Sequence, residues 1–351
     1  MKKKPVRRKG GDAVTIHEVA HKAGVSPMTV SRVINGNVNV REATRERVMH
    51  AVRDLNYTPN PAARSLAAAQ GARIALIYTN PSAAYLSELL VGALAGVSRT
   101  AAQLVLDTWD YTNAAAQRAA ARKLATVVAG VILPPPLCES KAIVSELNAA
   151  NIPVVAVASA RFHSEISCVR IDDFRASKEM TEYLIGLGHS RIGYIKGHPN
   201  QTASSRRFEG YQAALQEAGI ATDSSLVQQG YFTYRSGLDA TKKLLSLKHT
   251  PTAIFASNDD MAAAAISVAH RRGLDVPRDL SVVGFDDTPI GMTLWPELTT
   301  IHQPIADMAE SAIDLLLRSI RRKDGDTRVV VDQVVPHVLV KRDSVAPPPK
   351  K

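Results

Sequence analysis

The chain has 351 residues, of which 45% are hydrophobic and 22% charged, and its net charge is +10. This length and composition indicate a soluble globular protein of two or three domains. It has no run of about 18 apolar residues, no apolar segment behind its basic N-terminus, and only two cysteines, Cys138 and Cys168. These features exclude a membrane span, a secretory signal, a disulfide scaffold and a cysteine zinc site, and they favour a reducing cytoplasm.

The positive charge is concentrated at the start of the chain. Residues 1–72 hold 13 Lys or Arg against 5 Asp or Glu, whereas residues 73–351 hold 30 against 28. Such asymmetry suggests a module that binds a polyanion, attached to a nearly neutral body. A solubilising tail is the alternative, because the first nine residues alone contribute +6. Charge by itself leaves both interpretations open.

The first predicted elements are two short helices joined by a tight turn. Thr15 and Glu18 form a capping box for a helix over residues 16–23, and Gly24 suits the left-handed residue that ends it. Ser26 and Pro27 then open a second helix as N-cap and first residue. A third helix is predicted over residues 42–55. Two helices joined by a glycine turn indicate a helix-turn-helix.

With this pattern the segment resembles the lactose-repressor (LacI) family of bacterial transcriptional regulators, also called the LacI/GalR family. The matching residues are Thr15-Ile16, Val19-Ala20, Ala23-Gly24-Val25-Ser26, Thr29-Val30-Ser31-Arg32-Val33, Asn35, Thr44-Arg45, Val48, Leu55-Asn56-Tyr57 and Pro59-Asn60. The pattern extends over some 45 residues and is highly specific. A structural helical bundle without DNA binding is the alternative.

The exposed start of the second helix is expected to enter the major groove of DNA. Arg32 can donate two hydrogen bonds to a guanine or bind a phosphate. The resemblance implies that Pro27 and Met28 also meet bases, and these side chains offer only apolar contact. Thr29, Ser31 and Asn35 are better placed for phosphates. The full set of expected DNA contacts is Thr15, Ser26, Pro27, Met28, Thr29, Ser31, Arg32, Asn35, Tyr57, Asn60, Ala63 and Leu66.

Residues 60–67 can form a short helix with Asn60 as N-cap and Pro61 as its first residue, although an isolated helix of this length is marginal. The resemblance implies a hinge helix that orders on DNA when two subunits pair. Leu66 is then the wedge that opens a central base step in the minor groove. A plain alanine-rich linker is the alternative.

From residue 73 onward, short apolar runs alternate with amphipathic stretches, as in parallel doubly wound sheets. The predicted strands are Ile74–Thr79, Leu104–Asp107, Gly130–Leu133, Pro153–Ala158, Val169–Asp172, Arg191–Lys196, Ala253–Ser257 and Val282–Phe285. The predicted helices are Tyr85–Ala101, Ala114–Val127, Lys141–Ala150, Arg175–Leu187, Arg206–Glu217, Ser236–Leu245, Asp260–Arg272 and Ile305–Arg321. Two sets of strands suggest two lobes with a cleft outside the carboxyl ends of the strands.

The family resemblance continues to about residue 345, in motifs such as Leu187-Gly188-His189-Ser190-Arg191-Ile192, Arg207-Phe208-Glu209-Gly210-Tyr211, Ala256-Ser257-Asn258-Asp259 and Gly284-Phe285-Asp286-Asp287. It implies a fold related to periplasmic sugar-binding proteins, in which the chain crosses between the lobes three times and each lobe is discontinuous. The expected fold is therefore an N-terminal all-α helix-turn-helix domain with a hinge helix, followed by an α/β periplasmic-binding-protein-like domain of two doubly wound parallel-sheet lobes. Its expected parts are a basic leader (1–13), a DNA-binding domain (14–59), a hinge helix and linker (60–72), an effector-binding and dimerisation domain (73–345) and a tail (346–351).

The cleft is the expected place for a small effector. Asp286 closes a strand and Arg207 stands at a predicted helix start, so a carboxylate and a planar guanidinium are expected to face the crevice. The other effector-binding candidates are the aromatic residues Tyr85 and Phe232 and the polar residues Asp172 and Asn258. The structural alternatives are a surface position for Arg207, a turn former at Asp286 and a helix cap at Asn258.

The effector is harder to identify. Many family members carry Asn-Pro and two aromatic residues after the first strand, and here that place reads Ala83-Ala84-Tyr85-Leu86. The segment that adds polar contacts in purine-responsive relatives reads Gln201-Thr202-Ala203 and lacks their arginine. A nucleobase is thus disfavoured, and a sugar or sugar derivative is favoured from family frequency.

The sequence therefore favours a cytoplasmic, homodimeric DNA-binding regulator that is nucleoid-associated when bound. It is expected to bind a pseudo-palindromic operator, with repression favoured over activation, and to need no cofactor or metal. A C-terminal leucine heptad, which makes tetramers in this family, is absent from the Pro-rich end. The rivals are a sugar receptor without a DNA role and an enzyme on the same scaffold. Neither a phosphate loop nor a nucleophile elbow supports an enzyme.

Overall fold

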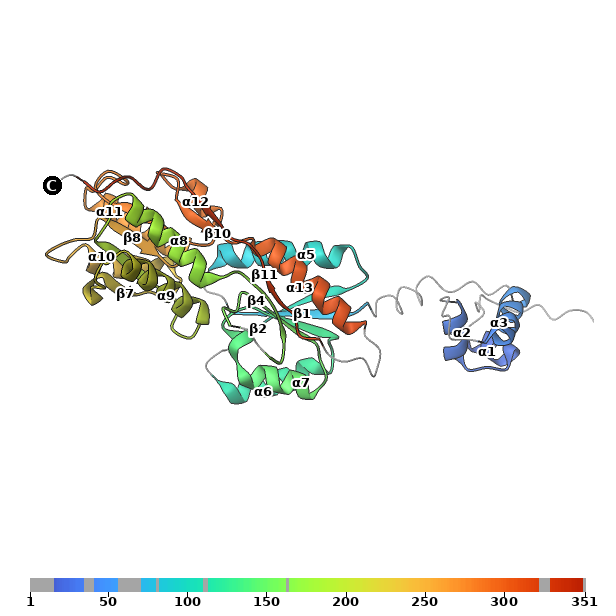
Figure 1. Cartoon of the computed structure of the whole chain (residues 1–351). Helices are drawn as coiled ribbons and strands as arrows, with labels where there is room; N and C mark the ends of the chain where they lie inside the picture. The colour runs from blue at the N-terminus through green and yellow to red at the C-terminus, as the bar shows by residue number, and fades with distance from the viewer. Residues whose placement is uncertain are drawn as a thin grey trace, which may run out of the picture. The chain divides into compact units, whose positions relative to one another are not determined.

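The structure is a computed structural model, and it describes residues 16–34, 41–55, 71–79, 82–109, 113–161, 164–321 and 329–349. The chain divides into two compact units, residues 1–71 and 72–351 (Figure 1). Within the described ranges, no helix is both long and apolar enough to cross a membrane.

The described part of the first unit is a three-helix domain. Its helices are α1 (Ile16–Ala23), α2 (Pro27–Ile34) and α3 (Glu42–Asp54). Gly24 has φ +64°, and the amide of Val25 donates to the carbonyl of Ala20 at 3.0 Å, so the chain turns sharply after α1. The small core that joins the helices consists of Val19, Ala20, Ala23, Val30, Val33, Val48 and Ala51.

The first helix of the predicted helix-turn-helix has the predicted bounds, the second begins at Pro27 as predicted, and the third ends one residue early. Helix α3 starts after Arg41, whose side chain makes no capping hydrogen bond. The expected hinge helix over residues 60–67, with Leu66, lies outside the described residues.

The first lobe of the second unit is built on a parallel six-stranded sheet in the order β11-β5-β4-β3-β1-β2. The strands are β1 (Arg73–Tyr78), β2 (Gln103–Thr108), β3 (Gly130–Leu133), β4 (Val154–Val157), β5 (Ser167–Arg170) and β11 (Asp332–Val334). One face carries α5 (Ala83–Ser98) and α13 (Ile305–Ile320), and the other carries α6 (Ala114–Ala125) and α7 (Lys141–Ala149) (Figure 1). A short 3₁₀ turn, η1 (Leu137–Glu139), follows β3.

The second lobe has a parallel four-stranded sheet in the order β7-β6-β8-β9. Its strands are β6 (Ile192–Lys196), β7 (Val227–Gln229), β8 (Ala253–Ala256) and β9 (Ser281–Val283). Its helices are α8 (Asp173–Gly186), α9 (Thr202–Glu217), α10 (Tyr234–Leu244) and α11 (Asp259–Arg271), with η2 (Ser224–Leu226) and α12 (Ile290–Thr293) in connections. An antiparallel pair, β10 (Thr300–His302) and β12 (Val338–Val340), lies beside them.

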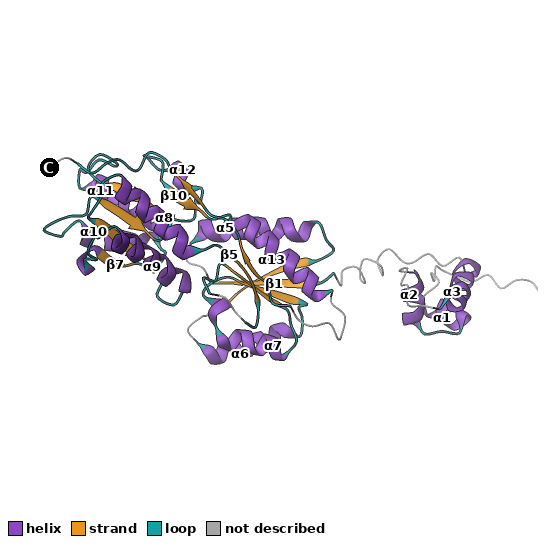
Figure 2. Cartoon of the chain, viewed as in Figure 1, coloured by secondary structure: helices purple, strands orange, loops and turns teal. Residues whose placement is uncertain are grey.

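Both sheets are covered by helices on their two faces, so alternate residues of a strand enter different cores (Figure 2). Ile74 and Leu76 of β1 pack in the core that contains α5 and α13, whereas Ala75 and Ile77 pack in the core under α6 and α7. Double burial explains why the strands read as continuous apolar runs. The expected pair of doubly wound parallel-sheet lobes is confirmed.

The chain passes between the lobes three times, after β5, after β10 and after β11. All eight predicted strands are present, with ends shifted by up to two residues. Sequence analysis missed β7, β10, β11 and β12, because each has only three residues and depends on pairing with distant strands.

Candidate functional sites

The candidate DNA-reading surface is the start of α2. The hydroxyl of Ser26 accepts a hydrogen bond from the amide of Thr29 at 3.2 Å, and the two hydroxyls lie 2.9 Å apart. Ser26 therefore caps the helix and is exposed, while Pro27 and Thr29 are half-buried. This arrangement leaves the side chain of Ser26 open to a partner.

The other nine expected DNA contacts lie outside the described side chains or residues. Met28, Ser31 and Arg32 lie on α2, but their side chains are not described. Thr15, Asn35, Tyr57, Asn60, Ala63 and Leu66 lie outside the described residues. Their roles stay predictions.

In the second unit, a narrow cavity lies where side chains of the two lobes meet. It encloses about 30 Å³ and is lined by Ser82, Tyr85, Pro135 and Ala158 from the first lobe, and by Gln201, Ala203, Arg207, Phe232, Asn258 and Asp286 from the second. Pockets for drug-sized ligands hold roughly 300–1,000 Å³. A ring-sized ligand therefore fits only if the lobes separate or the lining side chains move.

Arg207 is the central charge of this cavity, and it is only 5% exposed. Its Nε donates to Asp173 at 2.7 Å, its Nη1 donates to the carbonyl of Ser257 at 2.6 Å, and the same Nη1 lies 3.5 Å from Asp286. The guanidinium carbon also lies 3.6 Å from the centre of the Phe285 ring. Burial raises the pKa of both carboxyl groups, and the positive charge of Arg207 opposes that rise.

Three residues of the cavity have backbone conformations that side chains rarely adopt. Ala158 has φ +58°, Phe232 has φ +59° and Asp286 has φ +112°. The Phe232 ring lies against Gly197, where a Cβ atom would overlap it. Such conformations persist only where the surrounding structure holds them, and they concentrate at functional sites.

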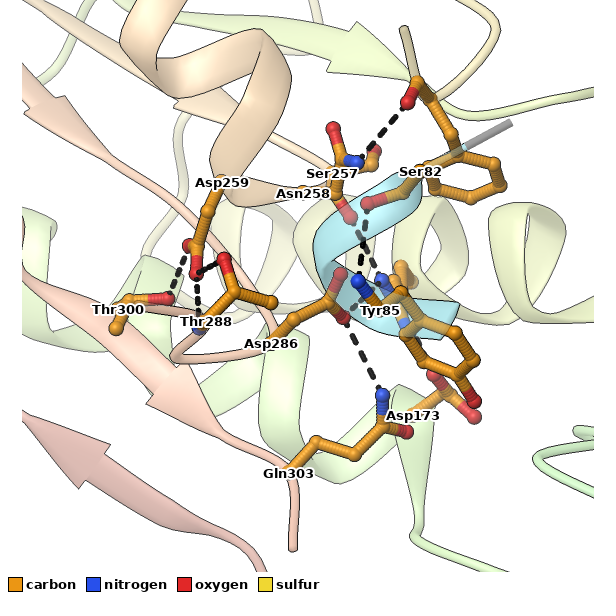
Figure 3. Close-up of polar contacts among 12 residues, drawn as sticks. Ser82, Tyr85, Asp173, Ser257, Asn258, Asp259, Asp286, Thr288, Thr300 and Gln303 are labelled. Carbon is orange, nitrogen blue, oxygen red and sulfur yellow. Dashed lines mark hydrogen bonds and ion pairs between the residues drawn. The ribbon is translucent and has the colours of Figure 1, made fainter. Parts of the chain in front are cut away.

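Two polar atoms beside the cavity are unsatisfied. Among the described residues, the hydroxyl of Tyr85 and Oε1 of Gln303 are buried without a hydrogen-bond partner. Gln303 is held next to Asp286 because its Nε2 donates to that carboxylate at 3.3 Å (Figure 3). The hydroxyl of Tyr85, a residue that lines the cavity, is therefore the unsatisfied group that a polar ligand could reach.

Five of the six predicted effector residues line this cavity: Tyr85, Arg207, Phe232, Asn258 and Asp286. Asn258 also caps α11, because its Oδ1 accepts from the amide of Met261 at 3.1 Å, and its Nδ2 donates to the carbonyl of Phe232 at 3.1 Å. The cap and the cavity position proposed as alternatives for this residue thus coexist.

Asp172 lies apart from the other five. Its carboxylate caps α8 by accepting from the amide of Arg175 at 3.1 Å, and it lines a separate cavity of about 490 Å³. The neighbouring Asp173, which sequence analysis did not select, holds Arg207 instead.

The predicted start of the helix at Arg206 was also wrong. Helix α9 begins at Thr202, which places Arg207 in its second turn rather than at its start.

Sequence analysis also missed Ser82, Gln201, Ala203 and Gln303. The only signal for Gln201 and Ala203 was their place in a segment of known contacts in purine-responsive relatives.

Among the described residues, no cluster of three or more His, Cys, Asp or Glu side chains could hold a metal ion.

A buried carboxylate behind the cavity provides a prediction on stability. Asp259 accepts from the hydroxyl of Thr300 at 2.7 Å and from the amide and hydroxyl of Thr288 at 2.8 and 3.1 Å (Figure 3). Burial raises the pKa of Asp259 to about 7. The folded chain then holds a proton that the unfolded chain has lost between about pH 4 and 7, so this group lowers stability as pH rises through that window.

We expect Asp259→Asn to remove this titrating group. The free energy of unfolding should then fall less steeply as pH rises, by up to about 1.4 kcal/mol per pH unit. Asparagine preserves the size of the side chain, and its amide group can donate to the Thr300 hydroxyl. Urea unfolding of the second unit at pH 4.5, 5.5, 6.5 and 7.5 measures the slope. The exposed Asp239→Asn serves as control, and an unchanged slope in Asp259→Asn would contradict the prediction.

Comparisons with known proteins find matches for both units of the chain. A family model described as bacterial regulatory proteins, lacI family, matches residues 15–60, and one described as a periplasmic binding protein-like domain matches residues 181–345. Catabolite control protein A of Priestia megaterium is 33% identical, over 94% of this chain and 99% of the relative. The HTH-type transcriptional repressor PurR of Pectobacterium carotovorum is 36% identical, over 95% and 98%.

Solved structures agree with these relatives. The transcriptional regulator CelR in complex with cellobiose has a TM-score of 0.70 and 32% identity, with 94% of this chain and 99% of that chain covered. The lac repressor dimer bound to operator and the anti-inducer ONPF has a TM-score of 0.70 and 28% identity, with 95% and 100% covered.

Proposed function

The chain belongs to the lacI family of bacterial regulatory proteins, and from this premise we propose that it is a cytoplasmic, homodimeric repressor whose affinity for a pseudo-palindromic operator is set by a sugar or sugar derivative. Its relatives are DNA-binding transcription regulators with the same two domains.

The observation that carries the effector part of the proposal is the cavity between the lobes. Charged, amide and hydroxyl groups converge there beside the faces of Phe232 and Tyr85. Planar polar groups bind sugar hydroxyls, and aromatic rings pack against the apolar face of a sugar ring. The CelR–cellobiose complex and the name of the ribose operon repressor of Escherichia coli, which is 33% identical, support a carbohydrate.

The homodimer is supported by apolar side chains that are exposed on the second unit. Val91 and Leu94 on α5 are 59% and 54% exposed, and Met292 and Trp295, in and just after α12, are 60% and 84% exposed. Large apolar groups are rarely left exposed without a partner, so each of these two pairs is a candidate contact for another protein surface. We propose that a second copy of the chain covers these side chains. The dimer would then hold two copies of α2, one for each half-site of the operator.

Control of DNA binding follows from the three crossings between the lobes. An effector bound between the lobes changes their separation, and this alters the spacing of the two hinge segments in the dimer and so the affinity for operator. The coupling is reciprocal, so operator changes effector affinity by the same factor. A coupling free energy of about 1–3 kcal/mol between the two sites is enough for a useful switch.

A gel shift on genomic fragments, with and without cellobiose, ribose and a purine base, tests the proposal. We expect the protein to select a fragment with an inverted repeat and a carbohydrate to change its retention. A protein that never selects DNA would contradict the regulatory role, and a response to the purine alone would contradict a carbohydrate effector.

The expected hinge helix provides a second test. Replacing Leu66 by alanine removes the proposed wedge, so we expect operator affinity to fall much more than non-specific affinity, which depends on phosphate charge. Titrations of operator and scrambled duplexes measure both constants. Ala67→Gly in the same segment keeps the Leu66 side chain but weakens the short helix, so it serves as a control for loss of helix stability alone. Equal loss for both duplexes in Leu66→Ala would refute the wedge.

A further inference from the structure

One carboxylate of the first lobe is bonded to a helix of the second lobe. Glu139 lies in η1, just after β3, and its two carboxylate oxygens accept from the amide of Thr202 at 3.0 and 3.2 Å. One of them also accepts from the hydroxyl of Thr202. Thr202 is the first residue of α9, so this contact, here called the cross-lobe cap, joins the two walls of the cleft.

Helix α9 otherwise has a poorly satisfied start. Its N-cap residue Gln201 makes no side-chain capping hydrogen bond, and its first turn contains no acidic residue. The first amides of a helix need acceptors, and negative charge at this end is favourable. Glu139 supplies both from the other lobe.

The position is unfavourable for a carboxylate without this partner. Burial raises the pKa of Glu139, while the hydrogen bonds from Thr202 and the nearby charge of Arg161 oppose the rise. A half-buried carboxylate therefore gains its donors only when α9 is in place against η1. The contact thus favours the closed arrangement of the lobes.

The same first turns of α9 form a wall of the cavity. Gln201 and Ala203, on either side of Thr202, line it, and Arg207 follows in the second turn. A shift of the helix start moves all three, because they share one rigid element.

We propose that Glu139 is a positioning residue of the effector site, which holds the start of α9 across the cleft and thereby keeps the lobes closed and Arg207 aligned. The effector readout of this proposal rests on the proposed function, but the contact itself can be tested without effector or DNA.

Hydrogen exchange measured by mass spectrometry on the full chain tests the cross-lobe cap. In Glu139→Ala, we expect the amides of residues 202–205 to exchange faster by roughly three- to tenfold, the range of a lost helix cap. Glu139→Gln retains one acceptor oxygen and is expected to show an intermediate rate. Unchanged exchange at residues 202–205 in Glu139→Ala would overturn the proposal.

The matched control is Glu146→Ala. Glu146 pairs with Arg122 at 3.1 Å within the first lobe, so its loss should leave residues 202–205 unaffected. If exchange in Glu139→Ala accelerates throughout both lobes, Glu139→Gln decides, because it keeps the size of the side chain and one acceptor oxygen while it removes the charge. Faster exchange confined to the start of α9 supports the cross-lobe cap, and no change there overturns it.

Effector titration then separates this inference from the proposed function. If a sugar binds the parent chain, we expect Glu139→Ala to change its Kd by about threefold or more while Glu146→Ala does not. An equal Kd in both variants would overturn the positioning role. Failure of every sugar to bind the parent would contradict the carbohydrate effector, and the exchange experiment would still judge the cross-lobe cap.

Discussion

Arg207→Ala is expected to abolish the response to effector and to destabilise the second unit. The substitution leaves Asp173 and Asp286 buried without their cation, and breaking a buried ion pair from one side costs about 3–5 kcal/mol. The cavity also loses its fork of hydrogen-bond donors, so effector affinity should fall by roughly 100-fold or more. Urea unfolding and effector titration measure the two effects.

Arg206→Ala is the matched control, because Arg206 precedes Arg207 on α9 but is only half-buried and pairs with Glu209 on the same helix. Its loss should change stability by less than about 1 kcal/mol. Burial already raises the pKa of both aspartates, and the loss of the Arg207 charge should raise each pKa further. The stability deficit of Arg207→Ala should therefore shrink in acid, where these carboxyl groups bind protons. Equal stability of the two variants would show that Arg207 is not the central charge of the cavity.

Val48→Asp is expected to abolish operator binding while effector binding is retained. Val48 is completely buried in the seven-residue core of the first unit, on α3 rather than on the proposed reading helix. An unpaired buried charge costs more than about 4 kcal/mol, and a core of this size rarely supplies more than about 3–5 kcal/mol. Gel shift and effector titration on the same preparation separate the two units.

Met49→Asp is the control for this experiment, because Met49 is the next residue on α3 and is 39% exposed. It adds the same charge to the same helix without entering the core. If Met49→Asp loses operator as completely as Val48→Asp, the loss reflects charge repulsion from DNA rather than unfolding of the first unit.

The helices and long strands could be predicted because their signals are local. The cap at Ser26, the glycine at position 24 and the apolar runs of the doubly buried strands depend on near neighbours in sequence. Short strands such as β10 and β12 carry no such pattern. They form because the chain returns to the second lobe after visiting the first.

The cavity was predictable only in part. Arg207 and Asp286 stand in recognisable motifs, and both line it. The sequence could not distinguish Asp172 from Asp173, because the two acids are adjacent at the start of the same helix, one as its N-cap and the other as its first residue. Tertiary packing points one carboxylate at the amide of Arg175 and the other at Arg207.

By itself, therefore, the sequence determined the helix-turn-helix, the alternating α/β pattern and the charge that separates a basic N-terminal segment from a nearly neutral body. Only the tertiary structure decided which acids face Arg207 and that Glu139 reaches Thr202, 63 residues away. The physical reason is that burial and pairing of charges depend on groups brought together by the closing of two lobes, and no local pattern in the sequence encodes that approach.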